Sequence, residues 1–179
     1  MTKTKTLRKS DLKDRIRDIP DFPKEGIIFK DITTLLKDAE AFKKSVNLLA
    51  GKFKKEMIDY VVGVEARGFI FGATLAYKLG AGFVPVRKKG KLPAKTQSIT
   101  YELEYGKDVL EIHEDALGPG ARVLIVDDLL ATGGTIKAVS ELVKAQKATI
   151  AGVAFLVELK FLRGKEKLKD LPVYSVIKY

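Results

Sequence analysis

Two adjacent acids, Asp127 and Asp128, precede a turn of small and hydroxyl-bearing residues. The turn consists of Ala131, Thr132, Gly133, Gly134 and Thr135. Its glycines leave backbone N–H groups unobstructed and its threonines add two hydroxyls, so the turn could cradle a phosphate at the start of a helix. The acids would repel that phosphate unless they face hydrogen-bond donors, and the 2′ and 3′ hydroxyls of a ribose are such donors. The segment predicts a ribose 5-phosphate site; the alternative is an acidic turn that only starts a helix.

Two common nucleotide motifs are absent from the sequence. There is no G-x-x-x-x-G-K-[ST] phosphate loop, and no G-x-G-x-x-G follows a predicted strand. A phosphate cradle with diol-binding acids, but without the lysine of a phosphate loop, indicates a sugar phosphate rather than a nucleoside triphosphate.

Short apolar runs alternate with helical patterns along the chain. The predicted strands are residues 60–64, 83–86, 123–126, 150–157 and 173–177. The predicted helices are residues 68–79, residues 135–146 and an amphipathic helix that carries Phe42, Val46, Leu49 and Phe53. Such strands, separated by helices, are typical of an α/β fold with a mostly parallel central sheet flanked by helices. Ligands of these sheets bind at the carboxyl ends of the strands, where the two acids would stand.

Residues 87–111 interrupt this alternation. The segment is polar, contains Gly90, Pro93 and Gly106, and is longer than a connecting loop should be. Long irregular insertions in compact domains are usually functional lids or disordered segments, and we interpret this one as a long flexible lid loop. His113 follows on what looks like a strand that re-enters the sheet, and we interpret it as structural. We also expect Pro85 to weaken hydrogen bonding along the strand at 83–86.

The composition fits one compact domain, residues 1–179, with a partly flexible basic segment at 1–20. Hydrophobic residues make up 46% of the chain and charged residues 31%, which argues against disorder. Cysteine is absent and histidine occurs once, which excludes disulfides, cysteine-ligated metals and multi-histidine metal sites. The longest apolar run, 150–157, is shorter than the ~20 residues of a membrane helix. We expect a cytoplasmic protein without a membrane partner.

The formal net charge is +10, which has two interpretations. Such a chain could bind polyanions such as nucleic acid, or it could be an enzyme for phosphorylated small molecules. Much of the excess lies in stretches expected to be in solvent, which are Lys3, Lys5, Arg8, Lys9 and the run 160–169. We therefore favour surface charge around a basic substrate site, and expect no specific nucleic acid partner.

The 127–135 segment resembles the phosphoribosyl diphosphate motif of type I phosphoribosyltransferases. Further blocks in the same order resemble the adenine phosphoribosyltransferases within that family, namely residues 22–33, 61–71, 85–93 and 103–106. The similarity covers residues 21–162. It implies the type I fold with a small N-terminal flap. It also implies transfer of the phosphoribosyl group of 5-phosphoribosyl 1-diphosphate to adenine, which gives AMP and diphosphate in purine salvage.

The resemblance implies a second anion site for the leaving diphosphate. Its residues would be Glu65, Ala66, Arg67, Arg87, Lys88 and Lys91, with a cis peptide between the first two and Arg67 also catalytic. In the family the residue at Arg87 reaches into the neighbouring subunit's site, which implies a homodimer. The alternatives are that Arg67 is a buried arginine paired with an acid and that the basic run after it is a solvated surface.

The resemblance also implies the residues that act on the base. Glu104 matches the family's acid/base carboxylate, and the base-binding residues would be Ile28, Phe29, Lys30 and Tyr105. Lys30 departs from the family's usual arginine, and a lysine is a point donor that cannot form a two-pronged contact. We expect Mg²⁺ to arrive bound to the diphosphate, without a metal site built by the protein.

Two other functions remain open at this stage. The sugar-phosphate motif does not read the base, so a 6-oxopurine such as hypoxanthine, guanine or xanthine could replace adenine. The chain could also be a non-catalytic regulator that senses phosphoribosyl diphosphate. Regulators of that kind carry a nucleic-acid-binding domain, and the stretch before Asp21 is too short for one.

Overall fold

The computed structural model describes residues 7–103 and 106–179, and it divides into two compact units, residues 1–48 and 49–179. The first unit contains the short helix η1 (Ser10–Arg15), strands β1 (Arg17–Ile19) and β2 (Phe29–Asp31), and helix α1 (Thr33–Leu36). Helix α2 (Ala39–Phe53) crosses the boundary between the units. It begins where Asp38 accepts the backbone N–H groups of Glu40 and Ala41, as an N-cap acid does.

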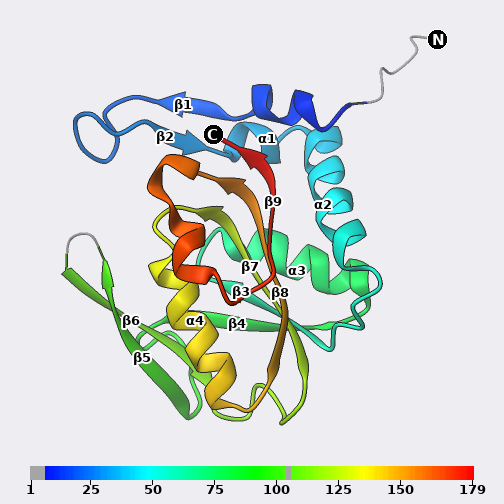
Figure 1. Ribbon diagram of the computed structural model, residues 1–179, viewed down its shortest axis with the longest axis vertical. Helices are drawn as coiled ribbons and strands as arrows, with labels where there is room; N and C mark the ends of the chain where they lie inside the picture. Colours follow the sequence, from blue (N-terminus) through cyan, green and yellow to red (C-terminus); the bar gives the residue numbers. More distant parts are fainter. Residues whose placement is uncertain (1–6, 104–105) are drawn as a thin grey trace. The chain divides into compact units, whose positions relative to one another are not determined.

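The second unit is built on a seven-stranded sheet in the order β5-β6-β4-β3-β7-β8-β9 (Figure 1). The strands are β3 (Tyr60–Val64), β4 (Gly82–Lys88), β5 (Thr96–Leu103), β6 (Gly106–His113), β7 (Arg122–Leu130), β8 (Thr149–Glu158) and β9 (Val173–Lys178). Strands β4, β3, β7, β8 and β9 are parallel, whereas β5 and β6 form an antiparallel hairpin at one edge. The predicted parallel α/β architecture is therefore confirmed.

Helices α3 (Gly68–Leu79) and α4 (Gly134–Ala145) cover opposite faces of this sheet (Figure 1). The two crossover connections run in opposite directions across the sheet. One connects β3 to β4 toward the β5 edge, and the other connects β7 to β8 toward the β9 edge. Right-handed crossovers in opposite directions place their helices on opposite faces. The neighbouring strands β3 and β7 thus part at their carboxyl ends, and such a switch point is where open α/β sheets bind ligands.

The central strands are apolar because both of their faces are covered. Residues 61–64 of β3 and residues 152–158 of β8 are buried without interruption. All five predicted strands and all three predicted helices are confirmed, with ends that differ by a few residues. Across the described ranges 7–103 and 106–179, no helix is long and apolar enough to cross a membrane.

The segment 87–111 differs from the predicted loop. Most of it is the hairpin β5–β6, whose register runs from Thr96 opposite His113 to Leu103 opposite Gly106. The sequence did not show these strands because the hairpin contains many polar residues. One face of an edge hairpin can face water, so polar side chains are tolerated there. The prediction that His113 lies on a strand re-entering the sheet is confirmed.

Pro85 lies in β4 opposite Gly63 of β3. On its other side, β4 pairs with β6 only from Arg87 onward. A proline without a backbone N–H is tolerated there because that side of the strand has no ladder partner at Pro85.

Candidate active site

The adjacent acids lie where β7 loses one of its two neighbours. Pairing with β3 ends at Val126, opposite Gly63, whereas pairing with β8 continues to Leu130. Asp127 and Asp128 therefore lie in the last part of strand β7, ahead of the turn. The edge that β3 leaves open is the switch point between the two crossovers.

The glycine-rich turn joins β7 to α4 as predicted. Gly133 has a φ of 80° and stands directly before the first residue of α4, so the turn ends in a left-handed residue at a helix N-terminus. A cavity of about 60 Å³ opens here, with room for one substituent rather than a nucleotide. It is lined by Asp127, Leu129, Leu130, Ala131, Thr132, Gly133, Thr135 and Ile136. The predicted phosphoribosyl residues around the turn thus come together, with the N–H groups of a helix start beside them.

A contact from far along the chain fixes this turn. A Cβ on Gly133 would lie 2.5 Å from the carbonyl oxygen of Gly164, and a Cβ on Gly164 would overlap the carbonyl oxygen of Ala131. The two backbones touch directly, so neither glycine has room for a side chain. Gly164 begins η3 (Gly164–Leu168) and escaped the sequence analysis, because nothing local in the sequence indicates which distant loop it meets.

The predicted diphosphate loop lies at the end of the neighbouring strand. The expected cis peptide between Glu65 and Ala66 is present, and Arg67 is the N-cap residue of α3. A guanidinium nitrogen of Arg67 lies 2.8 Å from a carboxyl oxygen of Asp128. The arginine–acid pairing that the sequence analysis left as an alternative is therefore present, and it joins the two predicted anion sites to each other.

The electrostatics of the two acids are unfavourable in the absence of a ligand. The backbone N–H of Asp128 donates to a carboxyl oxygen of Asp127 at 2.8 Å. Burial, followed by the charge of Asp128, raises the pKa of Asp127 well above its ordinary value. Burial also raises the pKa of Asp128, although the nearby Arg67 guanidinium opposes that shift. Strongly raised carboxyl pKa values in a cleft at a sheet edge indicate a functional site.

The cationic run after β4 is engaged by the chain's own acids. The Arg87 guanidinium donates to both carboxyl oxygens of Glu65 at 3.0 and 3.2 Å and to the carbonyl oxygen of Lys91 at 3.0 Å. This pairing lowers the pKa of Glu65. The side chain of Lys88 pairs with Asp108 at 3.1 Å. The Arg87 guanidinium thus binds acceptors of its own chain. Only the backbone of Glu65 could bind a diphosphate, because the carboxylate of Glu65 would repel the anion.

The hairpin β5–β6 lies close to the turn 131–135, the predicted phosphate-binding turn (hereafter the phosphate turn). The carbonyl oxygen of Glu102 lies 3.4 Å from where a Cβ on Gly134 would stand. Burial raises the pKa of the neighbouring Tyr101, and a hydrogen bond with Thr135 opposes that shift. The predicted acid/base residue Glu104 and the predicted base contact Tyr105 lie outside the described residues.

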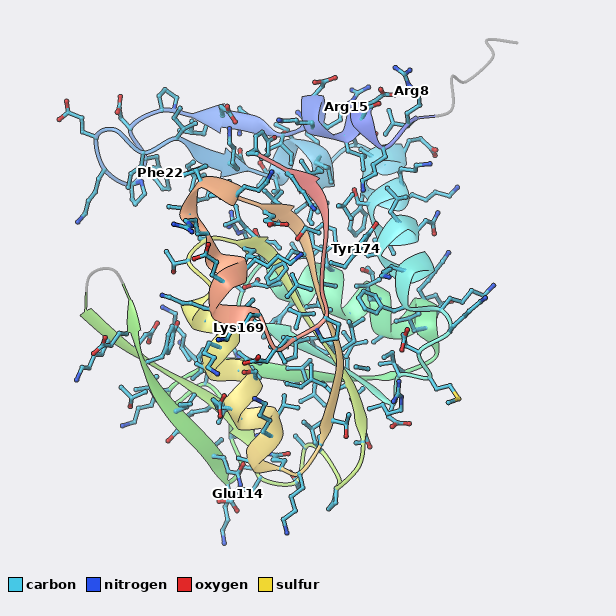
Figure 2. All side chains as sticks on the ribbon, viewed as in Figure 1. Arg8, Arg15, Phe22, Glu114, Lys169 and Tyr174 are labelled. Atoms are coloured by element: carbon cyan, nitrogen blue, oxygen red, sulfur yellow. The ribbon has the colours of Figure 1, made fainter. Side chains whose placement is uncertain are left out.

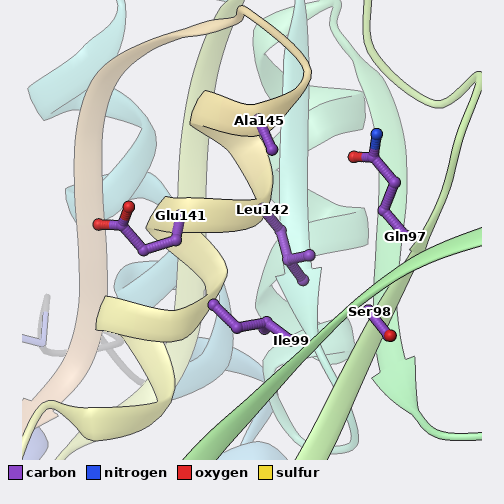
Figure 3. Close-up of a pocket in the computed structure, with 6 residues that line it drawn as sticks. All are labelled: Gln97, Ser98, Ile99, Glu141, Leu142 and Ala145. Atoms are coloured by element: carbon purple, nitrogen blue, oxygen red, sulfur yellow. The ribbon is translucent and has the colours of Figure 1, made fainter.

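A second cavity, of about 370 Å³, separates the hairpin from α4 (Figure 3). It is lined by Gln97, Ser98, Ile99, Glu141, Leu142 and Ala145. Ile99, Leu142 and Ala145 supply its apolar lining. The buried Oε1 atom of Gln97 has no hydrogen-bond partner among residues 7–103 and 106–179. No predicted site residue lines this cavity.

Three of the four predicted base contacts lie in the first unit, at and before β2. Ile28 is exposed, and Phe29 packs edge-on against Phe22 with ring centroids 5.1 Å apart. The Lys30 ammonium lies 2.7 Å from each carboxyl oxygen of Asp18. The Lys30 ammonium is therefore paired with an acid. The comparison of lysine with the family's usual arginine did not predict this ion pair.

Among residues 7–103 and 106–179, no group of three or more His, Cys, Asp or Glu side chains could hold a metal ion. The neighbouring acids Asp127 and Asp128 could still supply one or two oxygens to an ion that a ligand brings with it. Mg²⁺ is commonly bound in this way, by one or two carboxylates together with substrate phosphates.

Comparison with known proteins identifies the family. Residues 32–178 match the family model described as "Phosphoribosyl transferase domain". The chain is 56% identical to the adenine phosphoribosyltransferase of Acidobacterium capsulatum, covering 100% of this chain and 99% of the relative. It is 61% identical to that of Syntrophotalea carbinolica, with coverages of 94% and 99%.

Solved structures agree with these relatives. The adenine phosphoribosyltransferase of Thermoanaerobacter pseudethanolicus matches with a TM-score of 0.93 and 56% identity, covering 96% of this chain and 100% of that one. The Saccharomyces cerevisiae enzyme, solved with adenine and an imino-altritol bisphosphate, matches with a TM-score of 0.88 and 44% identity over 94% and 97%. The family model and these relatives together show that the chain belongs to the adenine phosphoribosyltransferase family.

Proposed function

We propose that the protein transfers the 5-phosphoribosyl group of 5-phosphoribosyl 1-diphosphate to adenine, giving AMP and diphosphate. The observation that carries this function is the Arg67–Asp128 ion pair, which joins the two anion-binding loops at one sheet edge. A substrate with a phosphate at one end and a diphosphate at the other requires two such loops close together. The choice of adenine as the base rests on the relatives, which are named adenine phosphoribosyltransferases.

In this reaction the turn 131–135 holds the 5-phosphate through backbone N–H groups and threonine hydroxyls. Asp127 and Asp128 accept hydrogen bonds from the ribose hydroxyls. Arg67 then turns from Asp128 to the diphosphate, whose negative charge grows as its bond to C1 of the ribose breaks and the base nitrogen attacks. The diphosphate thus takes over the cation that pairs with Asp128 in the free protein.

We propose that Mg²⁺ enters with the diphosphate and that Asp127 and Asp128 lie near it. When bound, the ion supplies positive charge to the leaving group. Two adjacent carboxylates with raised pKa values would be stabilised in their charged form by such an ion.

We propose Glu104 as the acid/base residue that accepts the proton lost by the attacking base. Glu104→Gln should lower turnover by about 10²–10⁴-fold with little change in affinity for the diphosphate substrate. Single-turnover kinetics measure the first quantity and calorimetric titration the second. Single-turnover rates that match the unmodified protein would reduce Glu104 to a surface acid.

The decisive test of the reaction is a comparison of bases. Adenine, hypoxanthine, guanine and xanthine are each supplied with 5-phosphoribosyl 1-diphosphate and Mg²⁺, and the nucleotide formed is measured. We expect AMP from adenine and little nucleotide from the others, because sites built on polar matches discriminate by about 10⁴ or more. Comparable product from a 6-oxopurine would reject adenine as the base, and no product from any purine would favour a sensor of the diphosphate.

We propose that the protein works as a homodimer through the exposed apolar face of α3. Ile70 and Tyr77 stand two turns apart on that helix, and Tyr77 is 90% exposed. Phe83 of β4 adds a third exposed apolar side chain. Tyr77→Lys should shift the protein from dimer to monomer in sedimentation equilibrium, and a dimer that survives this change would place the interface elsewhere.

We also propose that the two units act as one phosphoribosyltransferase domain in the cytoplasm. The matched range 32–178 begins in the first unit and runs through the second, which supports a single functional domain. The absence of cysteine agrees with a reducing compartment. Residues 49–179 expressed alone should then fail to form AMP.

A further inference from the structure

A strongly basic segment of the chain touches the phosphate turn. Residues 160–169 contain one acid, Glu166, and five cations, which gives the segment a net charge of +4. The cations are Lys160, Arg163, Lys165, Lys167 and Lys169. Within the segment, the backbone of Gly164 lies directly against the backbones of Ala131 and Gly133. The excess positive charge is therefore located next to the proposed site of the 5-phosphate.

Packing fixes this segment in place. Helix η3 (Gly164–Leu168) lies alongside α4, where Figure 1 shows it in orange-red, and Figure 2 labels Lys169 just beyond its last residue. Leu168 is 1% exposed and belongs to the same buried cluster as Ile136 and Val139 of α4. The segment is thus anchored at both ends of η3, by Gly164 at the phosphate turn and by Leu168 in the core.

The charged side chains between these two anchors face solvent. Lys165 and Lys167 are both exposed. The Arg163 guanidinium pairs with the Glu166 carboxylate at 2.6 Å. A 3₁₀-helix rises about 2 Å per residue, so the whole of η3 is about 10 Å long. The backbones of Lys165 and Lys167 are therefore within about 10 Å of the phosphate turn, which is about the Debye length at 0.1 M salt.

Charges at this distance act on a ligand before it makes contact. A phosphate monoester carries about 1.5 to 2 negative charges at pH 7. Positive charge around a site raises the local concentration of such an anion and can raise its association rate constant by about 10–10³-fold. Charges at the rim of a site change mainly the association rate and its dependence on salt.

We propose that residues 160–169 form an electrostatic steering segment, in which Lys165 and Lys167 attract 5′-phosphorylated ribosyl ligands to the phosphate turn without binding them. The inference rests on the proposed function, which places the 5-phosphate at residues 131–135. Substrate and AMP share this phosphate, so the segment acts on the capture of both. Its lysines act on the rate of capture and leave the chemical step unchanged.

The test is the association rate of formycin 5′-monophosphate, a fluorescent analogue of AMP, measured by stopped-flow fluorescence. Lys165→Gln combined with Lys167→Gln should lower the association rate constant by about three- to tenfold at 0.01 M salt, where the Debye length is about 30 Å. At 1 M salt, where it is about 3 Å, the variant should match the unmodified protein. The dissociation rate constant should change by less than about twofold.

Two further variants isolate the effect of charge near the turn. Lys54→Gln combined with Lys55→Gln removes two equally exposed lysines that precede the amino end of β3. The phosphate turn follows the carboxyl end of the parallel strand β7, about 25 Å away along that strand, so this control should lose less than about twofold.

Glu166→Gln changes the charge of the segment in the opposite direction. Removal of its carboxylate makes the segment more positive, so the association rate constant should rise by about twofold at 0.01 M salt. A variant that merely disturbed η3 would not bind the analogue faster. Association that is slower than in the unmodified protein would contradict steering.

The outcomes separate this inference from the proposed function. If the unmodified protein forms no AMP from adenine, the proposed function fails. If it forms AMP and the Lys165 and Lys167 double variant keeps the association rate of the unmodified protein at low salt, the function stands and the steering role is rejected. A loss that persists at 1 M salt, or that lies in the dissociation rate, also rejects steering, because it would indicate direct contact with the ligand.

Discussion

Acids in the ribbon of the first unit and acids at the edge of the large sheet have opposite surroundings. In the ribbon, Asp18 faces Lys30 and Asp31 faces Arg17. Hydrogen bonds from Thr33, followed by the Arg17 guanidinium, lower the pKa of Asp31 to about 2. At the sheet edge, Asp128 is buried, the adjacent Asp127 is half-buried, and both pKa values are raised.

The opposite pKa shifts indicate that aspartates have different roles in the two regions. An acid with a lowered pKa stabilises the fold whenever it is charged, so that contribution is present above the ordinary value of 3.8 and is lost as the pH falls toward 2. An acid with a raised pKa costs stability when it is charged, and a nearby cation such as Arg67 offsets only part of that cost for Asp128. The paired acids of the ribbon thus stabilise the folded chain, whereas raised pKa values at the sheet edge are typical of functional sites.

The largest effect is expected from an alanine in the phosphate turn. Gly133 and Gly26 of the ribbon loop both have a φ of 80°, but only Gly133 touches another backbone. Gly26→Ala should lower the free energy of unfolding by about 1–2 kcal/mol through left-handed strain alone. Gly133→Ala should lower it by about 2–5 kcal/mol, because overlap with Gly164 adds about 1–3 kcal/mol to the same strain.

Chemical denaturation measures these losses, and calorimetric titration measures affinity for the diphosphate substrate. That affinity should disappear in Gly133→Ala and persist in Gly26→Ala. Equal behaviour of the two variants would mean that the contact with Gly164 does not shape the turn.

The next effect comes from neutralising the acids one at a time. Asp127→Asn and Asp128→Asn should each weaken binding of the diphosphate substrate by about 1.5–3 kcal/mol, the worth of a charge-assisted hydrogen bond. Their effects on stability should differ. Asp127→Asn removes a buried repulsion and should raise the melting temperature of the free protein, whereas Asp128→Asn removes the partner of Arg67 and should not.

The gain in Asp127→Asn should depend on pH. A carboxyl whose pKa is raised by folding binds its proton more tightly in the folded chain, so stability falls as the pH rises above the ordinary value of 3.8. Asparagine does not titrate, and the advantage of the variant should therefore be larger at pH 8 than at pH 4. Melting curves at both values provide the check, and an advantage that shrinks with rising pH would contradict the raised pKa.

The smallest effect is expected from two uncharged residues, both glutamines. One lacks a hydrogen-bond partner for a buried atom and the other has its partners. Gln97 has a buried oxygen with no hydrogen-bond partner in the described part of the chain. Gln146 accepts from the Leu117 N–H at 2.9 Å and donates to the His113 carbonyl at 2.7 Å. Gln97→Met should raise the free energy of unfolding by about 1 kcal/mol, because it removes an unsatisfied group. Gln146→Met should lower it by about 1–3 kcal/mol, because it leaves two partners unsatisfied. Loss of stability in both would indicate that Gln97 has a partner in solution.

Much of the large unit could be predicted because its signals are local. The apolar runs of β3, β7 and β8 and the turn at 131–135 lie within short stretches of sequence, and the acids stand beside them. The hairpin β5–β6 was not predicted because its edge position allows polar residues on a strand. The contact of Gly133 with Gly164 and the pairing of Lys30 with Asp18 join distant segments, and a single sequence does not show which segments meet.

The hairpin β5–β6 is joined to the rest of the sheet over a short length. Its own register extends over eight residue pairs, from Thr96 opposite His113 to Leu103 opposite Gly106. Its register with β4 consists only of Arg87 opposite Glu111 and Lys88 opposite Leu110. Strands β5 and β6 should therefore stay paired with each other when the short pairing of β6 with β4 opens. Backbone amides inside the hairpin would then exchange with solvent hydrogen more slowly than those that bridge β6 to β4.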